Sequence, residues 1–336
     1  MRAIVLVGGF GTRLRPLTLT TPKQMLPIVD RPMIERVVAS LADHGVSDAV
    51  LSLGYRPDAF VDTYPDDLCA GVRLHYAVEA EPLDTAGAVR FAATEADIDS
   101  TFLVVNGDVL TDLDVSALWK FHQEHGAEGT IALTPVEDPS RYGVVPIDDD
   151  GRVQAFIEKP PAGQAPSRWI NAGTYVLEPS VLERIPVGRR VSIERETFPR
   201  MVADGTLYAL QSDAYWVDAG TPETYLQAQL DLIDGVRGEA EPAVAPSAKI
   251  ASTAVVEHAI VMADAVVESG AEVVDSAVLP GARVCAGAVV RRSIVGPGAA
   301  VGEGARLDDL SVVGEGTVIE PGAVLHGARV PEVGDG

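Results

Sequence analysis

Apolar residues in the first 235 positions follow two patterns that alternate along the chain. Short aliphatic runs predict buried strands at 3–7, 48–53, 72–78, 101–105, 130–136 and 143–147. Apolar residues at helical spacing predict helices at 33–44, 86–95 and 116–125. Strands that alternate with helices are typical of βαβ units, so the pattern predicts an α/β fold with a doubly wound, mostly parallel sheet.

A further helix is expected from about residue 221 to residue 234. Thr221 suits the N-cap position because its hydroxyl can accept from a free backbone N–H. Pro222 suits the first helical position, and Glu223 lies where the helix dipole is positive. After Gly235 the composition changes, and residues 238–243 read as a linker.

Beyond the linker, aliphatic residues recur at intervals of six. They are Val295, Val301, Leu307, Val313, Ile319 and Leu325, and the residue four places after each of the first five is small: Ala299, Ala305, Ser311, Thr317 and Ala323. An earlier run at Val244, Ile250, Val256 and Met262 keeps the same period. The repeat resembles the hexapeptide repeat of left-handed parallel β-helices. A loose tail rich in Gly, Ala and Val would show no such spacing.

Composition and charge narrow the classes of partner. The chain has 336 residues and a formal net charge of −23, which argues against nucleic acid because polyanion binding requires a basic surface. No apolar run approaches the ~20 residues of a membrane span, and the chain starts without a signal-peptide pattern, so we expect no membrane partner and a cytoplasmic location. The two cysteines, Cys69 and Cys285, indicate neither a disulfide framework nor a thiolate metal site.

The first strand leads into the most informative stretch, GGFGTRLRPLT at residues 8–18, which is followed by Pro22 and Lys23. Glycines after a buried strand let backbone N–H groups approach a polyphosphate closely. The stretch completes neither the dinucleotide fingerprint nor the Walker loop. It resembles instead the signature of the sugar-1-phosphate nucleotidyltransferases, which make NDP-sugars from an NTP and a sugar 1-phosphate.

The resemblance extends to two acidic segments. Asp108 follows the strand predicted at 101–105, and Asp218 lies beside a glycine turn before the helix at 221–234. Both segments are similar to the metal-binding motifs of the same family, which implies Mg²⁺ bound by Asp108 and Asp218. Taken singly, each aspartate would be more typical of a turn or a helix cap.

Further segments carry the resemblance to both substrates. Glu81–Gly87 resembles the loop along the base and ribose, although Asp84 stands where glycine is common, as either a hydrogen-bond acceptor for a ligand or a surface acid. The implied nucleotide-binding residues are Leu6, Gly8, Gly9, Gly11, Thr12, Arg13, Lys23, Pro82, Leu83, Thr85, Ala86, Asn106 and Gly107. The implied sugar-phosphate residues are Gly143, Glu158, Lys159, Asn171 and Gly173. Arg13, Lys23 and Asp108 are the implied catalytic residues.

The sequence Leu6-Val7-Gly8-Gly9 is similar to the guanylyltransferases of the family, which implies GTP and mannose 1-phosphate as substrates and GDP-mannose as product. The alternatives are glucose-1-phosphate adenylyl- or thymidylyltransferases, a guanylyltransferase for a sugar-like secondary metabolite, a bifunctional acyltransferase and a non-catalytic regulatory subunit. On this interpretation residues 1–235 form the catalytic domain, and residues 236–336 form the linker and the β-helix. We expect the β-helix to mediate homo-oligomerisation, because its coils need a cap or a partner.

Overall fold

The computed structural model describes residues 1–54 and 56–332, which divide into two compact units. The first unit contains Met1–Gly9 and Glu35–Trp216, and the second contains Phe10–Ile34 and the chain from Val217 onward. The glycine-rich stretch is therefore divided between them, because Gly8 and Gly9 belong to the first unit and the residues from Phe10 belong to the second.

The first unit is built on a mixed sheet in the order β11-β10-β12-β7-β1-β4-β6-β5, with β9 beside β12 and β13 beside β9. The parallel strands at its centre are β7 (Phe102–Asn106), β1 (Arg2–Leu6), β4 (Asp48–Leu53) and β6 (Val72–Val78). The others are β5 (Leu68–Cys69), β9 (Gly129–Pro135), β10 (Gly143–Val144), β11 (Ile157–Glu158), β12 (Trp169–Leu177) and β13 (Leu207–Gln211). The predicted α/β fold is confirmed, with β12 antiparallel to β7.

Helices connect these strands. They are α1 (Met33–Asp43), α2 (Asp58–Thr63), α3 (Asp84–Glu95), α4 (Val115–His125) and α5 (Phe198–Asp204), and the short elements are β8 (Val109–Thr111), η3 (Pro139–Arg141), η4 (Pro179–Arg184), the π-helix η5 (Ile193–Thr197) and β14 (Trp216–Asp218). The Asp114 side chain begins α4 by accepting from the Ala117 N–H at 2.9 Å, and Gly126 ends it in a left-handed conformation. The predicted helices at 33–44, 86–95 and 116–125 correspond to α1, α3 and α4.

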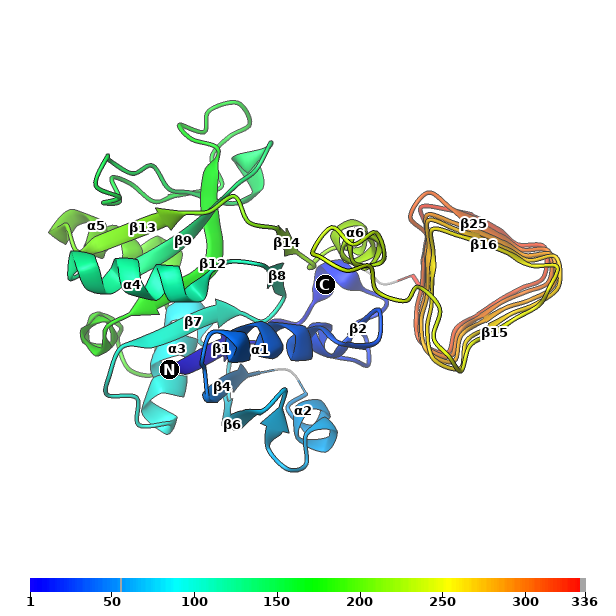
Figure 1. Ribbon diagram of the computed structural model, residues 1–336, viewed down its shortest axis with the longest axis horizontal. Coiled ribbons are helices and arrows are strands. Elements are labelled where there is room, and N and C mark those ends of the chain that lie inside the picture. Colours follow the sequence, from blue (N-terminus) through cyan, green and yellow to red (C-terminus); the bar gives the residue numbers. More distant parts are fainter. Residues whose placement is uncertain (55, 333–336) are drawn as a thin grey trace. The chain divides into compact units, whose positions relative to one another are not determined.

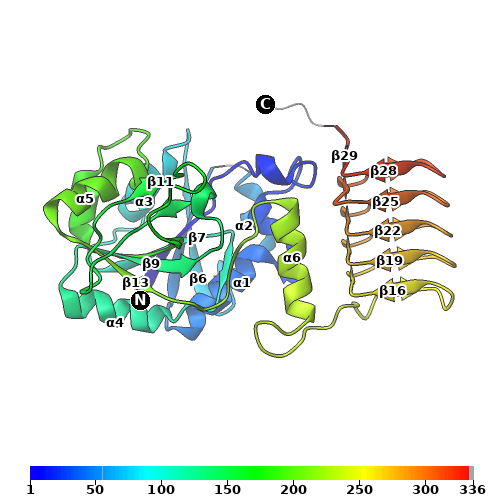
Figure 2. The same cartoon turned by 90° about the horizontal axis from the view of Figure 1, so that it is seen from above.

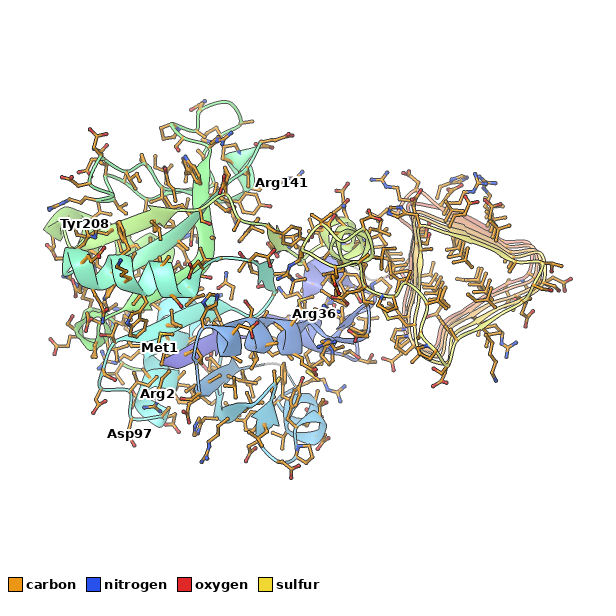
Figure 3. All side chains as sticks on the ribbon, viewed as in Figure 1. Met1, Arg2, Arg36, Asp97, Arg141 and Tyr208 are labelled. Carbon is orange, nitrogen blue, oxygen red and sulfur yellow. The ribbon has the colours of Figure 1, made fainter. Side chains whose placement is uncertain are left out.

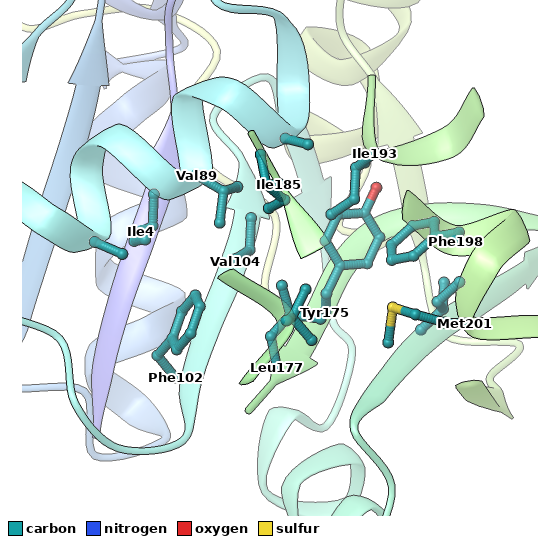
Figure 4. Packing of buried hydrophobic residues seen from close by; sticks show 14 of the residues in the cluster. Ile4, Val89, Phe102, Val104, Tyr175, Leu177, Ile185, Ile193, Phe198 and Met201 are labelled. Carbon is teal, nitrogen blue, oxygen red and sulfur yellow. The ribbon is translucent and has the colours of Figure 1, made fainter. Parts of the chain in front are cut away.

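The core of the first unit lies between the sheet and its helices (Figure 4). Ile4 of β1 and Val104 of β7 belong to one buried cluster with Val89 of α3. Tyr175 of β12 meets Phe198 of α5 edge to face, with ring centroids 5.2 Å apart. At the surface, Arg2 and Asp97 lie close together (Figure 3), and the Arg2 guanidinium donates to the Asp97 carbonyl oxygen at 3.2 Å.

In the second unit, short strands follow a triangular path (Figure 1), and their coils stack along one axis (Figure 2). In the described chain the strands form three parallel sheets. The first contains β15 (Lys249–Ile250), β18 (Val266–Val267), β21 (Arg283–Val284), β24 (Ala300–Val301) and β27 (Val318–Ile319). The second contains β16 (Val255–Glu257), β19 (Glu272–Val274), β22 (Val289–Arg291), β25 (Arg306–Asp308) and β28 (Val324–His326). The third contains β17 (Ile260–Val261), β20 (Ala277–Val278), β23 (Ile294–Val295), β26 (Val312–Val313) and β29 (Arg329–Val330). The predicted left-handed β-helix is confirmed.

The repeat is less uniform than the sequence pattern indicated. Val261, and not Met262, pairs in register with Val278 and belongs to the buried cluster of the β-helix. One side of the early coils is therefore a residue shorter than the other two sides. Residues at that corner, among them His258 and Asp275, have positive φ values of 45° and 47°, which tighten the turn.

The rest of the second unit is the segment 10–34 and helix α6 (Pro222–Ile233). Segment 10–34 contains η1 (Thr12–Leu14), η2 (Lys23–Met25) and the hairpin of β2 (Pro27–Ile28) with β3 (Arg31–Pro32). The Gln229 amide of α6 donates to the Pro27 carbonyl oxygen at 2.9 Å and accepts from the Val29 N–H at 2.7 Å. Thr221 caps α6 as predicted, accepting from the Thr224 N–H at 3.2 Å.

None of the helices in the described part of the chain combines the length and apolarity that a membrane span requires. Cys69 is buried in β5 and Cys285 is half-buried in the β-helix, and both are free thiols.

Candidate functional site

Two neighbouring parallel strands of the first unit, β1 and β7, end side by side. Leu6 pairs with Asn106 at these ends, and the Gly107 N–H donates to the Leu6 carbonyl oxygen at 2.9 Å. Asp108 follows in the same turn. The carboxyl ends of parallel strands are the usual ligand-binding edge of an α/β sheet. The predicted nucleotide residues Leu6, Asn106 and Gly107 thus lie together at this edge.

Glu79 is a buried carboxylate at the same edge that the sequence analysis did not single out. It follows β6 directly and is 9% exposed. Its Oε1 accepts from the Ser52 hydroxyl at 2.9 Å, and its Oε2 accepts from the Leu83 N–H at 2.9 Å. A Cβ added to Gly8 would lie 3.7 Å from Oε1. The sequence did carry a signal for Glu79, because an acid in the first position after the strand predicted at 72–78 lies at the ligand-binding edge of a parallel sheet.

The segment predicted to follow the base and ribose leads into α3, which begins at Asp84. Asp84 has a φ of 62°, in the left-handed region that glycine adopts without cost. Its Oδ1 accepts from the Thr85 N–H at 2.9 Å. The Thr85 hydroxyl donates to Glu194 at 2.7 Å and accepts from the Ile193 N–H at 2.8 Å, so it anchors α3 to η5. Ala86 is fully buried behind it.

On the opposite side of β7, strand β12 carries a bulge between Asn171 and Tyr175. The Asn171 amide donates to the Tyr175 hydroxyl at 2.8 Å, and its oxygen accepts from the Gly173 N–H at 2.9 Å. Gly173 has a φ of 76°, and a Cβ there would lie 2.5 Å from the Asn106 amide nitrogen. Glycine is therefore required at this position, and it brings the predicted sugar turn against the predicted nucleotide residue Asn106.

The remaining sugar-phosphate candidates lie on β10 and directly at β11, the last two strands at one end of the sheet. Gly143 of β10 pairs with Glu158 of β11, and the Lys159 N–H donates to the Tyr142 carbonyl oxygen at 3.0 Å. Lys159 Nζ is 3.7 Å from Glu158 Oε1, and the Lys159 side chain is 60% exposed. Tyr142 packs edge to face on Trp216, with ring centroids 5.7 Å apart. A cation and a carboxylate thus stand at an accessible edge beside two aromatic rings.

In the second unit, Arg13 and Asp218 are brought together from opposite ends of the sequence. Arg13 Nη2 lies 3.6 Å from Asp218 Oδ2, and Asp218 Oδ1 accepts from the Gly220 N–H at 2.9 Å. A Cβ on Gly220 would lie 2.6 Å from both Arg13 Nη2 and Asp218 Oδ1. The turn at Gly220 therefore holds the Arg13 guanidinium beside the Asp218 carboxylate. A guanidinium is a group that binds phosphate, and a carboxylate is a group that ligates metal ions.

The loop that carries Arg13 is closed upon itself. Gly11 has a φ of 61°, and the Thr18 hydroxyl donates to its carbonyl oxygen at 2.7 Å. Lys23 is 8% exposed, and a Cβ added to Gly11 would lie 3.2 Å from the Lys23 Cβ. Thr12 begins η1 directly after Gly11. Arg13 and Lys23 are thus two cationic residues of one tight loop, Arg13 with an exposed side chain and Lys23 buried.

The predicted site residues form two groups. The first unit contains Leu6, Gly8, Gly9, Pro82, Leu83, Thr85, Ala86, Asn106, Gly107, Asp108, Gly143, Glu158, Lys159, Asn171 and Gly173, and the second contains Gly11, Thr12, Arg13, Lys23 and Asp218. Across the described residues, no three His, Cys, Asp or Glu side chains gather as a ready metal site. Asp108 and Asp218 offer carboxylate oxygens, the donors that Mg²⁺ takes together with substrate phosphates.

Comparison with known proteins gives a consistent set of similarities. The Nucleotidyl transferase family matches residues 2–235, and the GMPPB C-terminal domain matches residues 239–332. A mannose-1-phosphate guanyltransferase of Emericella nidulans is 47% identical over 232 residues, which are 67% of this chain and 62% of that protein. The probable mannose-1-phosphate guanylyltransferase 2 of Oryza sativa is 36% identical over 335 residues, 94% of this chain and 91% of that protein.

Among solved structures, HddC from Yersinia pseudotuberculosis complexed with GMP-PN is 32% identical, with a TM-score of 0.59. The similarity covers 68% of this chain and 97% of that protein. In three curated relatives, the Emericella nidulans protein among them, the part that matches this chain is 62 to 65% of the relative's length.

Proposed function

The chain belongs to the nucleotidyl transferase family, and from this premise we propose that it transfers a guanylyl group from GTP to mannose 1-phosphate. The products are GDP-mannose and pyrophosphate. The observation that carries the proposal is the pair of Arg13 with Asp218 at 3.6 Å, which sets a cation of the type that binds phosphate beside a carboxylate of the type that ligates metal ions. The similarity to mannose-1-phosphate guanylyltransferases supports the choice of substrates.

The phosphates of the nucleotide are assigned to the glycine-rich stretch. The backbone amides of residues 8–12 and the Arg13 guanidinium bind the β- and γ-phosphates and the departing pyrophosphate. Lys23 neutralises charge near the reacting phosphorus. Phosphoryl chemistry of this type requires alignment of the attacking and leaving oxygens and fixed positive charge, both of which a tight loop supplies.

Members of the family use a divalent metal ion, and we assign Mg²⁺ to this protein. Asp108 and Asp218 would hold it, and the bound ion would offset phosphate charge. Asp218 is already oriented for this role by its hydrogen bond from the Gly220 N–H. Arg13 keeps the Asp218 carboxylate beside a positive charge, so both groups face the same phosphates.

The sugar phosphate is assigned to strands β10, β11 and β12, at one end of the sheet of the first unit. Lys159 pairs with its phosphate, Glu158 accepts from its hydroxyls, and Gly143, Asn171 and Gly173 border the sugar. A sugar phosphate carries almost two negative charges at neutral pH, because its second pKa is about 6. Its oxygen therefore attacks the α-phosphorus without a general base.

Glu79 supports guanine as the base. Its carboxylate is buried between Gly8 and the N–H of Leu83, two of the residues assigned to the nucleotide. At the position of the 2-amino group, where guanine presents N–H donors, adenine has only a C–H and thymine has a carbonyl acceptor, and a carboxylate only accepts. A carboxylate has about four acceptor sites, so Glu79 can accept from guanine in addition to the Ser52 hydroxyl and the Leu83 N–H, and it gains no such bond from a base without a donor there.

The test is pyrophosphate release across a grid of NTPs and sugar 1-phosphates in Mg²⁺. We expect the highest kcat/KM with GTP and mannose 1-phosphate, and a fall of about tenfold or more for GTP in Glu79→Gln. Glu81→Gln is the matched control, since Glu81 is an exposed acid of the same loop. A tenfold preference, about 1.4 kcal/mol, for ATP or dTTP would reject the guanylyl assignment. Absence of turnover with every pair would favour a regulatory subunit.

Cytoplasmic location and homo-oligomerisation through the β-helix are part of the same proposal.

A further inference from the structure

The last coils of the β-helix contact the loop that carries Arg13, within the second unit. Arg329 of β29 donates from Nη1 to the carbonyl oxygens of Arg13 and Arg15, at 2.9 and 3.1 Å. The Thr20 hydroxyl donates to the Glu315 carboxylate. A Cβ on Gly314 would lie 3.0 Å from Pro16 Cβ, so the coil and the loop are in close contact there as well.

These contacts satisfy a local need of the loop. The short helix η1 ends at Leu14, and the last carbonyl groups of a helix have no partner inside it. The Thr12 and Leu14 carbonyl oxygens accept from the N–H groups of Arg15 and Leu17, at 3.3 and 3.1 Å. Arg329 supplies the donor for the carbonyl oxygens of Arg13 and Arg15.

Helix α6, which follows Asp218 in the chain, also contacts the β-helix. Arg292 Nη2 lies 3.2 Å from Glu223 Oε1, in the first turn of α6, five residues after Asp218. Both partners of the pair therefore belong to segments that the β-helix contacts: Arg13 through Arg329, and Asp218 through the helix that follows it.

We propose that Arg329 is a positioning residue for the reaction: it fixes the backbone of the Arg13 loop, so that the guanidinium of Arg13 is held where it meets the nucleotide phosphates. The proposal rests on the proposed function for its substrate. It extends the role of the β-helix from assembly to preorganisation of the nucleotide site. Positioning of this kind acts on binding of the nucleotide and leaves the sugar-phosphate residues of the first unit unaffected.

The first test measures the loop itself, by hydrogen exchange of peptides covering residues 10–20 in the full chain. Arg329→Ala should raise exchange there, and Arg329→Lys should restore part of the protection because it keeps one donor. Gly314→Ala should also raise exchange, since its Cβ must displace Pro16. Arg306→Ala is the matched control. It also removes an arginine of the β-helix, but the ion pair of Arg306, to Asp308 at 2.9 Å, joins two residues of the β-helix itself.

The second test divides the kinetic effect between the two substrates. Arg329→Ala should raise KM for GTP roughly tenfold, the loss expected for two hydrogen bonds, with KM for mannose 1-phosphate within about twofold of the original value. Unchanged exchange at 10–20 in Arg329→Ala, with the β-helix still folded by circular dichroism, would overturn the proposal. Equal effects on both KM values would overturn it too. A parent protein without turnover would instead reject the proposed function, and hydrogen exchange would still decide the role of Arg329.

Discussion

His258 of the β-helix lies 3.0 Å from Asp234, measured between Nε2 and Oδ2, at the C-terminal end of α6. Its other ring nitrogen, Nδ1, contacts Asp275 in the next coil. One imidazole thus links α6 to two coils through two carboxylates. The hydrogen bond to Asp275 raises the pKa of His258 above its ordinary value of 6.5, and Asp234 acts in the same direction.

A pH dependence of stability follows from this raised pKa. The protonated ring is favoured in the folded protein, so its contribution is complete below the ordinary pKa and is lost as pH rises through the raised one. We expect His258→Gln to lower Tm more at acidic than at alkaline pH in melts between about pH 5.5 and 9. The same substitution in an Asp275→Asn background should show a weaker pH dependence. A Tm difference independent of pH would contradict the link.

Replacement of the metal-binding candidates should separate catalysis from folding. Asp218→Asn keeps an oxygen that can accept from the Gly220 N–H, so the turn should persist. A neutral amide binds Mg²⁺ poorly, and kcat should fall about a hundredfold or more in Asp218→Asn and in Asp108→Asn. Asp213→Asn, which changes an exposed acid, is the control for steady-state kinetics and Tm. Near-normal turnover would remove that aspartate from the metal site.

Lys159→Ala should act on the other substrate. The Lys159 side chain is exposed and stands 3.7 Å from Glu158, so its loss should leave the fold intact. We expect KM for mannose 1-phosphate to rise about tenfold or more, with nucleotide binding retained in calorimetric titration. Lys120→Ala removes an exposed lysine of α4 and should change neither quantity. A loss confined to GTP binding would reverse our assignment of the two phosphate sites.

Asp84 offers a test of backbone strain at the start of α3. Its φ of 62° is unfavourable for an alanine side chain and neutral for glycine. In urea denaturation, Asp84→Gly should therefore have a free energy of unfolding about 1 kcal/mol above that of Asp84→Ala. The original protein should lie above Asp84→Ala, because Asp84 accepts from the Thr85 N–H. An alanine variant as stable as the glycine variant would show that the strain is relieved locally.

The β-helix is expected to support a homo-oligomer. Val318 and Val324 on its final coils are 66% and 58% exposed, so they are apolar side chains that a partner subunit would cover. Light scattering of the full chain should give a dimer or a larger assembly. A monomeric mass at working concentration would leave the Arg329 contacts as the role of the tail.

Local patterns in the sequence determined most of the secondary structure described above, together with the family resemblance. Aliphatic runs and helical spacing predicted β1, β4, β6 and β7 with α1, α3 and α4, because burial requires apolar residues at the period of each element. The hexapeptide spacing predicted a β-helix, and Thr221 predicted the start of α6. The glycine-rich stretch and the two aspartates carried the family resemblance, since chemistry of that kind requires particular residues in a fixed local order.

Tertiary structure decided which residues from distant segments contact each other. Strand β12 was not predicted, because Asn171 and Gly173 interrupt its apolar run, yet the bulge they form brings Gly173 against Asn106. Glu79 became a candidate only once Ser52 and Leu83 enclosed it. Neither the link from Arg329 to Arg13 nor the pair of Arg13 with Asp218 has a local signal. Such contacts join residues hundreds of positions apart, so they depend on how whole elements pack and not on the pattern within any one of them.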